Sequence, residues 1–228
     1  MIRVHVICEG QTEEMFVNQV LQARFQSRDI WFSPRLIGRP GHKGGKVNFH
    51  RLFTDVRQTL TGDPSAYCTT FFDFYGLDSG FPGRKEAEAQ TDPTDKAACV
   101  IRALIGSMRE KLGENPLHRL IPYIQMYEFE GLLFSDPAGL ARGIDQDDLV
   151  TDFREIGNAF DTPEWINDSP NTAPSKRIKG VFPEYDKPLH GSLAALEIGL
   201  DAMMRECGLF RAWLDRIAAL RPLDGSHA

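Results

Sequence analysis

Acidic residues follow apolar, strand-like segments at three separate places in this 228-residue chain. They are Glu9, Asp73 and the pair Glu128 and Glu130. Carboxylate oxygens with no neighbouring set of His or Cys favour hard cations, chiefly Mg²⁺ or Mn²⁺. A divalent ion held in this way suits phosphoryl transfer or phosphodiester hydrolysis, because it neutralises phosphate charge and helps to generate the attacking hydroxide. The sequence therefore predicts a metal-dependent site for phosphate chemistry.

Such a site requires a sheet that brings the acids together. Segments rich in β-branched and aromatic residues predict strands at 2–8, 30–37, 66–73 and 120–126. Apolar residues at helical spacing predict helices between these strands, at 13–25, 49–60 and 93–112. The alternation predicts an α/β fold with a mostly parallel sheet flanked by helices. Right-handed crossovers would place the carboxyl ends of the strands, and hence the acids, along one edge.

The first junction reads as a strand that leads directly into a helix. Gly10 ends the predicted strand, and Thr12 is predicted to cap a helix whose first turn carries Glu13 and Glu14. Glu14 suits the positive end of the helix dipole. Glu9 has no such stabilising feature, because a carboxylate at a strand end costs desolvation energy unless a cation lies beside it.

A glycine-rich segment without any acid, 38–46, follows the second predicted strand. Its composition is typical of a solvated loop. Its three cations, Arg39, Lys43 and Lys46, also suit contacts with the phosphates of nucleic acid. The segment lacks the Gly-Lys-Ser/Thr sequence of a P-loop, so it does not predict that kind of nucleotide site.

Several motifs together give the chain a resemblance to a known superfamily. The stretch 8–14 (CEGQTEE) resembles the opening motif of the Toprim superfamily, in the form found in its OLD-type nuclease branch. The stretches 73–77 (DFYGL), 127–130 (YEFE), 174–178 and 185–187 resemble one Toprim-like family found beside ATPases in anti-phage systems. The effector subunit of the PARIS system is the example of that family. The resemblance covers most of the chain.

The resemblance implies roles for individual acids. Glu9 would act as the general acid/base or as a metal-linked proton carrier, and Glu13 and Asp73 would complete the catalytic set. The candidate metal ligands are Glu9, Asp73, Asp78, Glu128 and Glu130.

The second acidic motif departs from the superfamily pattern. Toprim proteins usually carry Asp-x-Asp where this chain has Asp73 followed by Phe and Tyr75. Asp78 is close enough in sequence to supply the second acid, or it could instead form a turn. Glu128 and Glu130 would lie on one face if the chain is extended there, with Glu128 favoured to point into the site. Surface acids on an exposed strand are the alternative interpretation of this pair.

The pattern changes after about residue 139, where a polar, acid-rich segment precedes amphipathic helices at 189–204 and 209–220. We expect a Toprim-like catalytic domain at 1–140 and a helical C-terminal extension at 141–228 packed on it. No internal repeat interrupts this organisation.

The C-terminal part also supplies cations. Lys176 and Arg177 would form a cationic track for nucleic acid if they and the loop cations flank the acidic site. Lys176 and Lys187 could each contact phosphate or simply balance the acids around them.

Composition limits the classes of protein that remain. A formal net charge of −6 argues against a generally basic surface for nucleic acid, although a local basic path is compatible with it. The four cysteines lack metal-ligand spacing and suit buried thiols in a reducing compartment. The chain shows neither a leader-like segment nor an apolar run long enough for a membrane span, so we expect a cytoplasmic protein.

The leading hypothesis is a Mg²⁺-dependent Toprim-type nuclease that serves as a phage-defence effector. Its expected partners are nucleic acid (DNA or RNA), a controlling ATPase and, in a homodimer, a second copy of the chain. One alternative is a catalytically weak regulatory subunit of an ATPase complex, which the missing Asp-x-Asp pattern supports. Another is a phosphohydrolase or phosphotransferase that acts on a small nucleotide.

Overall fold

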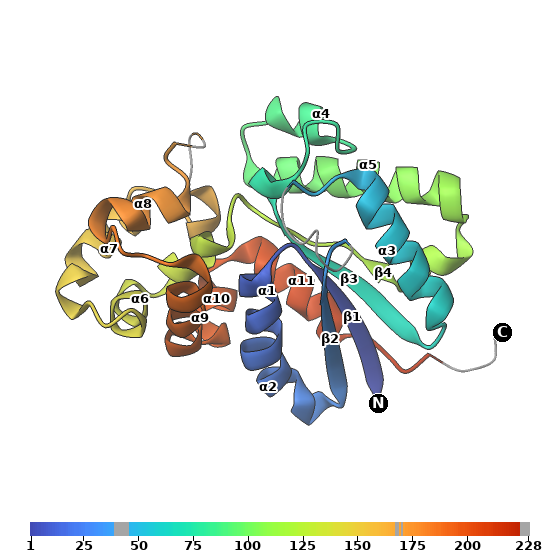
Figure 1. Cartoon of the computed structure of the whole chain (residues 1–228), viewed down its shortest axis with the longest axis horizontal. Coiled ribbons are helices and arrows are strands. Elements are labelled where there is room, and N and C mark those ends of the chain that lie inside the picture. The colour runs from blue at the N-terminus through green and yellow to red at the C-terminus, as the bar shows by residue number, and fades with distance from the viewer. Residues whose placement is uncertain (39–45, 167–168, 170, 224–228) are drawn as a thin grey trace.

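The computed structural model of the chain describes residues 1–38, 46–166, 169 and 171–223 (Figure 1). Its sheet consists of β1 (Ile2–Cys8), β2 (Ile30–Leu36), β3 (Ala66–Asp73), β4 (Leu120–Ile121) and β5 (Ile124–Gln125). The order is β2-β1-β3-β4, with β5 also paired to β3, and every pairing is parallel. The predicted α/β class with a parallel sheet flanked by helices is therefore confirmed.

The fourth predicted strand is divided in two at Pro122. Proline has no N–H to donate to a sheet, so the ladder is interrupted between β4 and β5. The side chain of Thr70 replaces the missing backbone pairing. Its Oγ donates to the Tyr123 carbonyl at 2.7 Å and accepts from the Tyr123 N–H at 2.9 Å.

Helices cover both faces of the sheet (Figure 1). On one face, α3 (Phe49–Gly62) and α5 (Pro93–Leu112) pack against Cys68 and Phe72 of β3. The opposite face carries the first helical segment, which spans residues 11–25, and α11 (Gly208–Ala218). Since all eight residues of β3 are buried, this strand forms the centre of the molecule.

The first helix begins earlier than the sequence predicts, and it is not uniform. Gly10, rather than Thr12, is the N-cap, because the Glu13 carboxylate accepts a hydrogen bond from the Gly10 N–H at 2.9 Å. Thr12 is buried instead. The predicted single helix consists of α1 (Gln11–Phe16), a π-helical turn η1 (Val17–Leu21) and α2 (Gln22–Phe25).

A lobe of short helices follows β5 and lies to the left in Figure 1. It contains η5 (Phe129–Ser135), α6 (Pro137–Gly143), α7 (Val150–Asn158), α8 (Pro174–Val181), α9 (Lys187–Ile198) and α10 (Leu200–Glu206). The predicted helix over 189–204 is divided at Gly199, whose φ of 75° ends α9. Shorter elements are η2 (Gln26–Arg28), η3 (Phe74–Gly76), α4 (Arg84–Glu88), η4 (Asn115–Arg119), η6 (Asp147–Leu149) and η7 (Pro163–Trp165).

The last helix, α11, returns from this lobe to the sheet. The Trp213 ring stacks on Tyr123, with ring centroids 4.4 Å apart and planes at 7°. Phe210 joins the same hydrophobic core as Phe16 and Phe71. The C-terminal helices and the sheet therefore share one core. None of the helices in the described part of the chain is both long and apolar enough to cross a membrane.

Candidate functional site

The carboxylates of Glu9 and Asp73 meet at one edge of the sheet. Their strands, β1 and β3, are adjacent and parallel, so the two residues come at neighbouring carboxyl ends. The Asp73 N–H donates to Glu9 Oε2 at 3.1 Å. Both residues line an open pocket of ≈ 310 Å³, together with Lys46, Tyr75, Gly76, Glu128 and Lys187. We call this the carboxylate pocket.

Gly76 leaves the space that the Glu9 side chain occupies. A Cβ at position 76 would lie 2.1 Å from Glu9 Oε2, far inside contact distance. The glycine is therefore needed for close approach rather than for an unusual backbone angle.

Replacing Gly76 with Ala should displace the Glu9 carboxylate from the carboxylate pocket. Overpacking of this kind costs about 1–3 kcal/mol, which lowers the melting temperature by several degrees. Gly106→Ala is the matched control, because open space surrounds a Cβ at that position within α5. Melting curves of the two variants provide the test. A Gly76→Ala protein as stable as Gly106→Ala would contradict the close approach.

Glu13 is nearly inaccessible to solvent, with 2% of its surface exposed. Its hydrogen bond to the Gly10 N–H holds the carboxylate toward the end of β1 rather than toward solvent. Burial and the nearby Asp73 carboxylate raise its pKa to about 7, against a partial opposing effect of Lys187. Glu13 therefore belongs to the same electrostatic cluster as Asp73, where the sequence resemblance placed it.

Lys187, the first residue of α9, supplies the cation of this cluster. Its Nζ lies 2.9 Å from Asp73 Oδ2 and 3.0 Å from Glu130 Oε2. The sequence left open whether Lys187 balances acids or contacts phosphate, and in this structure it balances acids. Burial on its own lowers the Lys187 pKa, but Asp73, Glu130 and Glu13 together raise it well above the usual range.

The YEFE motif does not adopt the extended conformation that would place Glu128 and Glu130 on one face of a strand. Glu128 precedes the 3-10 turn η5, and Glu130 lies within that turn. Both acids nevertheless face the cluster. Glu128 lines the carboxylate pocket and accepts from the Ser175 N–H at 2.9 Å, at the start of α8. Glu130 is fully buried beside Lys187, so it is not a surface acid.

Three carboxylate oxygens of the cluster have no hydrogen-bond partner among the described residues. They are Asp73 Oδ1 and both oxygens of Glu130, of which Oε2 lies in the ion pair with Lys187. Buried oxygens without a partner are costly unless a cation, a water molecule or a proton satisfies them.

Four carboxylates of the cluster, those of Glu9, Glu13, Asp73 and Glu130, hold protons unusually tightly. Burial, followed by the charges of Asp73 and Glu13, raises the pKa of Glu9 to about 8. Burial also raises the pKa of Glu130 to about 7 and that of Asp73 above its ordinary value, although Lys187 opposes both shifts. One lysine therefore does not compensate the negative charge of the cluster. A further cation bound there would be stabilising.

Other predicted site residues lie outside the carboxylate pocket or make contacts that the sequence did not predict. Asp78 Oδ1 accepts from the Gly80 N–H at 2.8 Å, which is the turn-forming role, and Asp78 does not line the carboxylate pocket. Lys176 is exposed on α8. Arg177 donates to the Thr172 carbonyl at 2.9 Å and lies over the ring of Phe160.

The loop cations are only partly placed. Lys46 is exposed at the edge of the carboxylate pocket, where it could meet a phosphate. Arg39 and Lys43 lie outside the described residues, so their predicted role in binding nucleic acid remains a prediction.

The carboxylate oxygens of the pocket are the kind of ligand that a hard cation prefers, but they do not form a complete, preformed metal site. In the described ranges, no group of three or more His, Cys, Asp and Glu side chains is arranged to hold a metal ion. Lys187 pairs with both Asp73 and Glu130, and Asp78 forms a turn with Gly80 and does not line the pocket. Mg²⁺, however, is commonly bound by one or two carboxylates together with water and substrate phosphate. Glu9 and Asp73 fit that arrangement.

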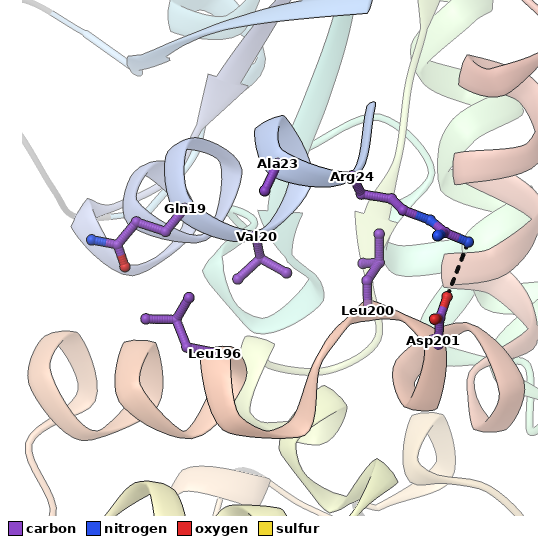
Figure 2. Close-up of a pocket in the computed structure, with 7 residues that line it drawn as sticks. All are labelled: Gln19, Val20, Ala23, Arg24, Leu196, Leu200 and Asp201. Atoms are coloured by element: carbon purple, nitrogen blue, oxygen red, sulfur yellow. Dashed lines mark ion pairs between the residues drawn. The ribbon is translucent and has the colours of Figure 1, made fainter. Parts of the chain in front are cut away.

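A second depression has no comparable chemistry. Figure 2 shows it between the first helical segment and the α9–α10 corner, where Val20, Leu196 and Leu200 face one another. Its charged residues, Arg24 and Asp201, satisfy each other in an ion pair of 3.1 Å. The carboxylate pocket is therefore the better candidate for catalysis.

Comparison with protein families identifies one match, described as "Domain of unknown function (DUF4276)", over residues 8–218. The chain belongs to this family. The match includes Glu9, the YEFE motif and Lys187, so the whole carboxylate cluster falls within the family domain. Neither the curated proteins nor the solved structures compared with the chain gave a match.

Proposed function

We propose that this DUF4276 protein is a Mg²⁺- or Mn²⁺-dependent Toprim-type nuclease that works in the cytoplasm. One observation carries the proposal: Glu9 and Asp73 lie at adjacent strand ends in an open pocket, within a cluster of acids whose one lysine, Lys187, does not compensate their negative charge. Burial of several acids around one lysine is costly, and a cation-dependent activity gives a physical reason for it.

Each residue of the pocket has a separate role in the proposed phosphodiester hydrolysis. When bound, a divalent ion supplies charge neutralisation at the phosphate and a more acidic water. Glu9, with a pKa of about 8, can hold or release a proton near neutral pH. Lys187 keeps Asp73 in position. Lys46, exposed at the rim, offers a positive charge to an incoming phosphate.

The proposal extends to a role as a phage-defence effector controlled by an ATPase. The support for it is the resemblance of the YEFE, 174–178 and 185–187 motifs to a family found beside such ATPases. A homodimer is compatible with the same role.

The ion pairs of Lys187 support a second candidate. Because Lys187 already pairs with Asp73 and Glu130, the cluster could serve mainly to fix α9 against the sheet. The protein would then be a catalytically weak regulatory subunit of an ATPase complex.

Metal binding and hydrolysis measured together separate these candidates. Mg²⁺ and Mn²⁺ are titrated calorimetrically into chelator-treated wild type and Asp73→Asn, with exposed Asp148→Asn as the matched control. The same proteins are incubated with labelled DNA, RNA and nucleoside triphosphates.

Chelator-sensitive cleavage of a strand that Asp73→Asn loses and Asp148→Asn retains supports the nuclease. Hydrolysis of free nucleotides alone favours a nucleotide phosphohydrolase. Absence of both metal binding and hydrolysis favours the regulatory subunit.

A further inference from the structure

A larger pocket, of ≈ 460 Å³, adjoins the carboxylate pocket and shares Tyr75 with it. Its walls come from the segments after β3 and β5, from the α4–α5 region and from the helical lobe. Its aromatic lining consists of Phe74, Tyr75, Tyr127, Phe160 and Trp165. We call it the aromatic pocket. Its volume falls within the range of about 300–1,000 Å³ that small-molecule sites occupy.

The aromatic rings are arranged as a packed floor with an open rim. Tyr127 packs against Tyr75 with ring centroids 5.5 Å apart, and edge-on against Phe74 at 5.8 Å. Phe74 and Tyr127 are buried, whereas Trp165 is 36% exposed. An exposed indole beside a rigid aromatic floor offers a flat surface to a second ring system. Nucleobases bind to such surfaces by stacking, and because every base has a flat face this binding depends little on the nucleotide sequence.

Positive charge lies over the same rings. The Arg84 guanidinium is 3.9 Å from the centroid of Phe74, and Lys96 Nζ is 5.2 Å from that of Tyr127. Glu88, which pairs with Arg84 at 3.0 Å, is the one carboxylate among the described residues that line the pocket. Burial and the nearby Arg84 lower the pKa of Lys96, against the opposing effect of Glu88. An anionic group that enters the pocket would therefore be stabilised.

We propose that the aromatic pocket binds the base of an unpaired nucleotide, so that the attached phosphate reaches Glu9 and Asp73. Tyr75, which lines both pockets, marks where base and phosphate would join. This inference rests on the proposed function and specifies its substrate class. The nucleotide can come from a single strand or be free, since both present the same base and phosphate. A fully paired duplex presents a base only when one is flipped out of the stack, which costs roughly a few kcal/mol, so it should bind more weakly.

Trp165→Ala is the direct test, with Trp31→Ala as its matched control. Trp31 is 38% exposed, close to the 36% of Trp165, but lies on β2 and does not line the aromatic pocket. Binding of a labelled single-stranded oligonucleotide is measured by fluorescence anisotropy in metal-free buffer. Trp165→Ala should weaken binding about tenfold, the order of loss expected for one stacked base. Trp165→Phe should restore most of it, and Trp31→Ala should bind like wild type.

Competition experiments distinguish the two sources of the base. AMP and UMP that displace the oligonucleotide, when ribose 5-phosphate does not, indicate a site for free nucleotides. Displacement by unlabelled single strands alone indicates a strand-binding site. Equal affinity for duplex and single strand, or equal binding by Trp165→Ala and wild type, overturns the inference.

Different outcomes would contradict the proposed nuclease activity and the proposed base-binding site. Trp165-dependent binding without metal-dependent cleavage would refute the nuclease and keep the aromatic pocket. Unchanged cleavage by Trp165→Ala would keep the nuclease and refute the pocket. A melting curve for each variant confirms that the fold is intact.

Discussion

Replacing Glu9 with Gln should abolish metal-dependent hydrolysis while leaving the fold intact. Loss of a general acid or base typically costs about 10²–10⁴-fold in rate. Gln keeps an oxygen that can accept from the Asp73 N–H, as Glu9 Oε2 does at 3.1 Å. The fold should therefore survive the change, and cleavage assays at saturating Mg²⁺ measure the loss directly.

The same variant should show a gain in stability that depends on pH. The folded-state pKa of Glu9 is about 8 and its ordinary value is 4.5. Between these values the folded protein binds more protons than the unfolded chain, so its stability falls as pH rises. Glutamine does not titrate, so the variant should melt at a progressively higher temperature than wild type as pH increases through this window without metal.

Glu14→Gln is the control for both measurements. Glu14 stands in the first turn of α1, close in sequence to Glu9, but does not line the carboxylate pocket. It should retain activity and show no such pH-dependent gain. Full activity of Glu9→Gln at saturating Mg²⁺ would rule out Glu9 as the proton carrier or metal ligand.

The sheet was predictable from the sequence because its signals are local. The strands at 2–8 and 66–73 are dense in apolar and β-branched residues, and the two helices predicted between them, at 13–25 and 49–60, have a clear periodicity. The parallel topology then places Glu9 and Asp73 at one edge. Local chemistry also explains what the patterns missed. Pro122 divides the fourth strand, and the Glu13 side chain moves the helix cap to Gly10.

The remainder of the site depends on contacts between residues distant in the chain. Lys187 pairs with Asp73 although the two residues are 114 positions apart in the sequence. A contact between residues so far apart cannot be predicted from the spacing of apolar residues. The sequence showed only that 185–187 is a motif with a cation. Gly76 likewise reads as a turn residue, although its role is to make room for Glu9. Trp165 and Tyr127 line the same aromatic pocket although they are distant in the sequence. Pocket walls formed by loops have no periodic sequence pattern from which they could be predicted.

Replacing Lys187 with Met should destabilise the protein strongly at alkaline pH and little at acidic pH. Removing one partner from a buried ion pair costs about 3–5 kcal/mol, because the other charge is left uncompensated. Asp73 and Glu130 would both lose their cation. The Lys187 pKa lies well above its usual range, so the lysine stays charged and stabilising at every pH below that range.

The pH dependence of the variant therefore comes from the carboxylates. Below pH 5 they can take up protons in place of the ammonium group, and the cost should become small. Near pH 8 they either ionise without a counter-ion or keep protons that the unfolded chain has released. The melting temperature should then fall by about 6–20 °C for a chain of this size. Saturating Mg²⁺ should restore part of the loss if the cluster binds a divalent cation.

Melting curves across pH 5–8, with and without Mg²⁺, test this expectation. Lys179→Met is the matched control, because Lys179 is exposed on α8 and its loss should change the melting temperature little at any pH. An equal loss for Lys187→Met at both ends of the pH range would mean that its methylene chain, and not its charge, stabilises the cluster. Rescue by Mg²⁺ would instead show that lysine and metal neutralise the same carboxylates, which links the stability of the fold to the proposed catalysis.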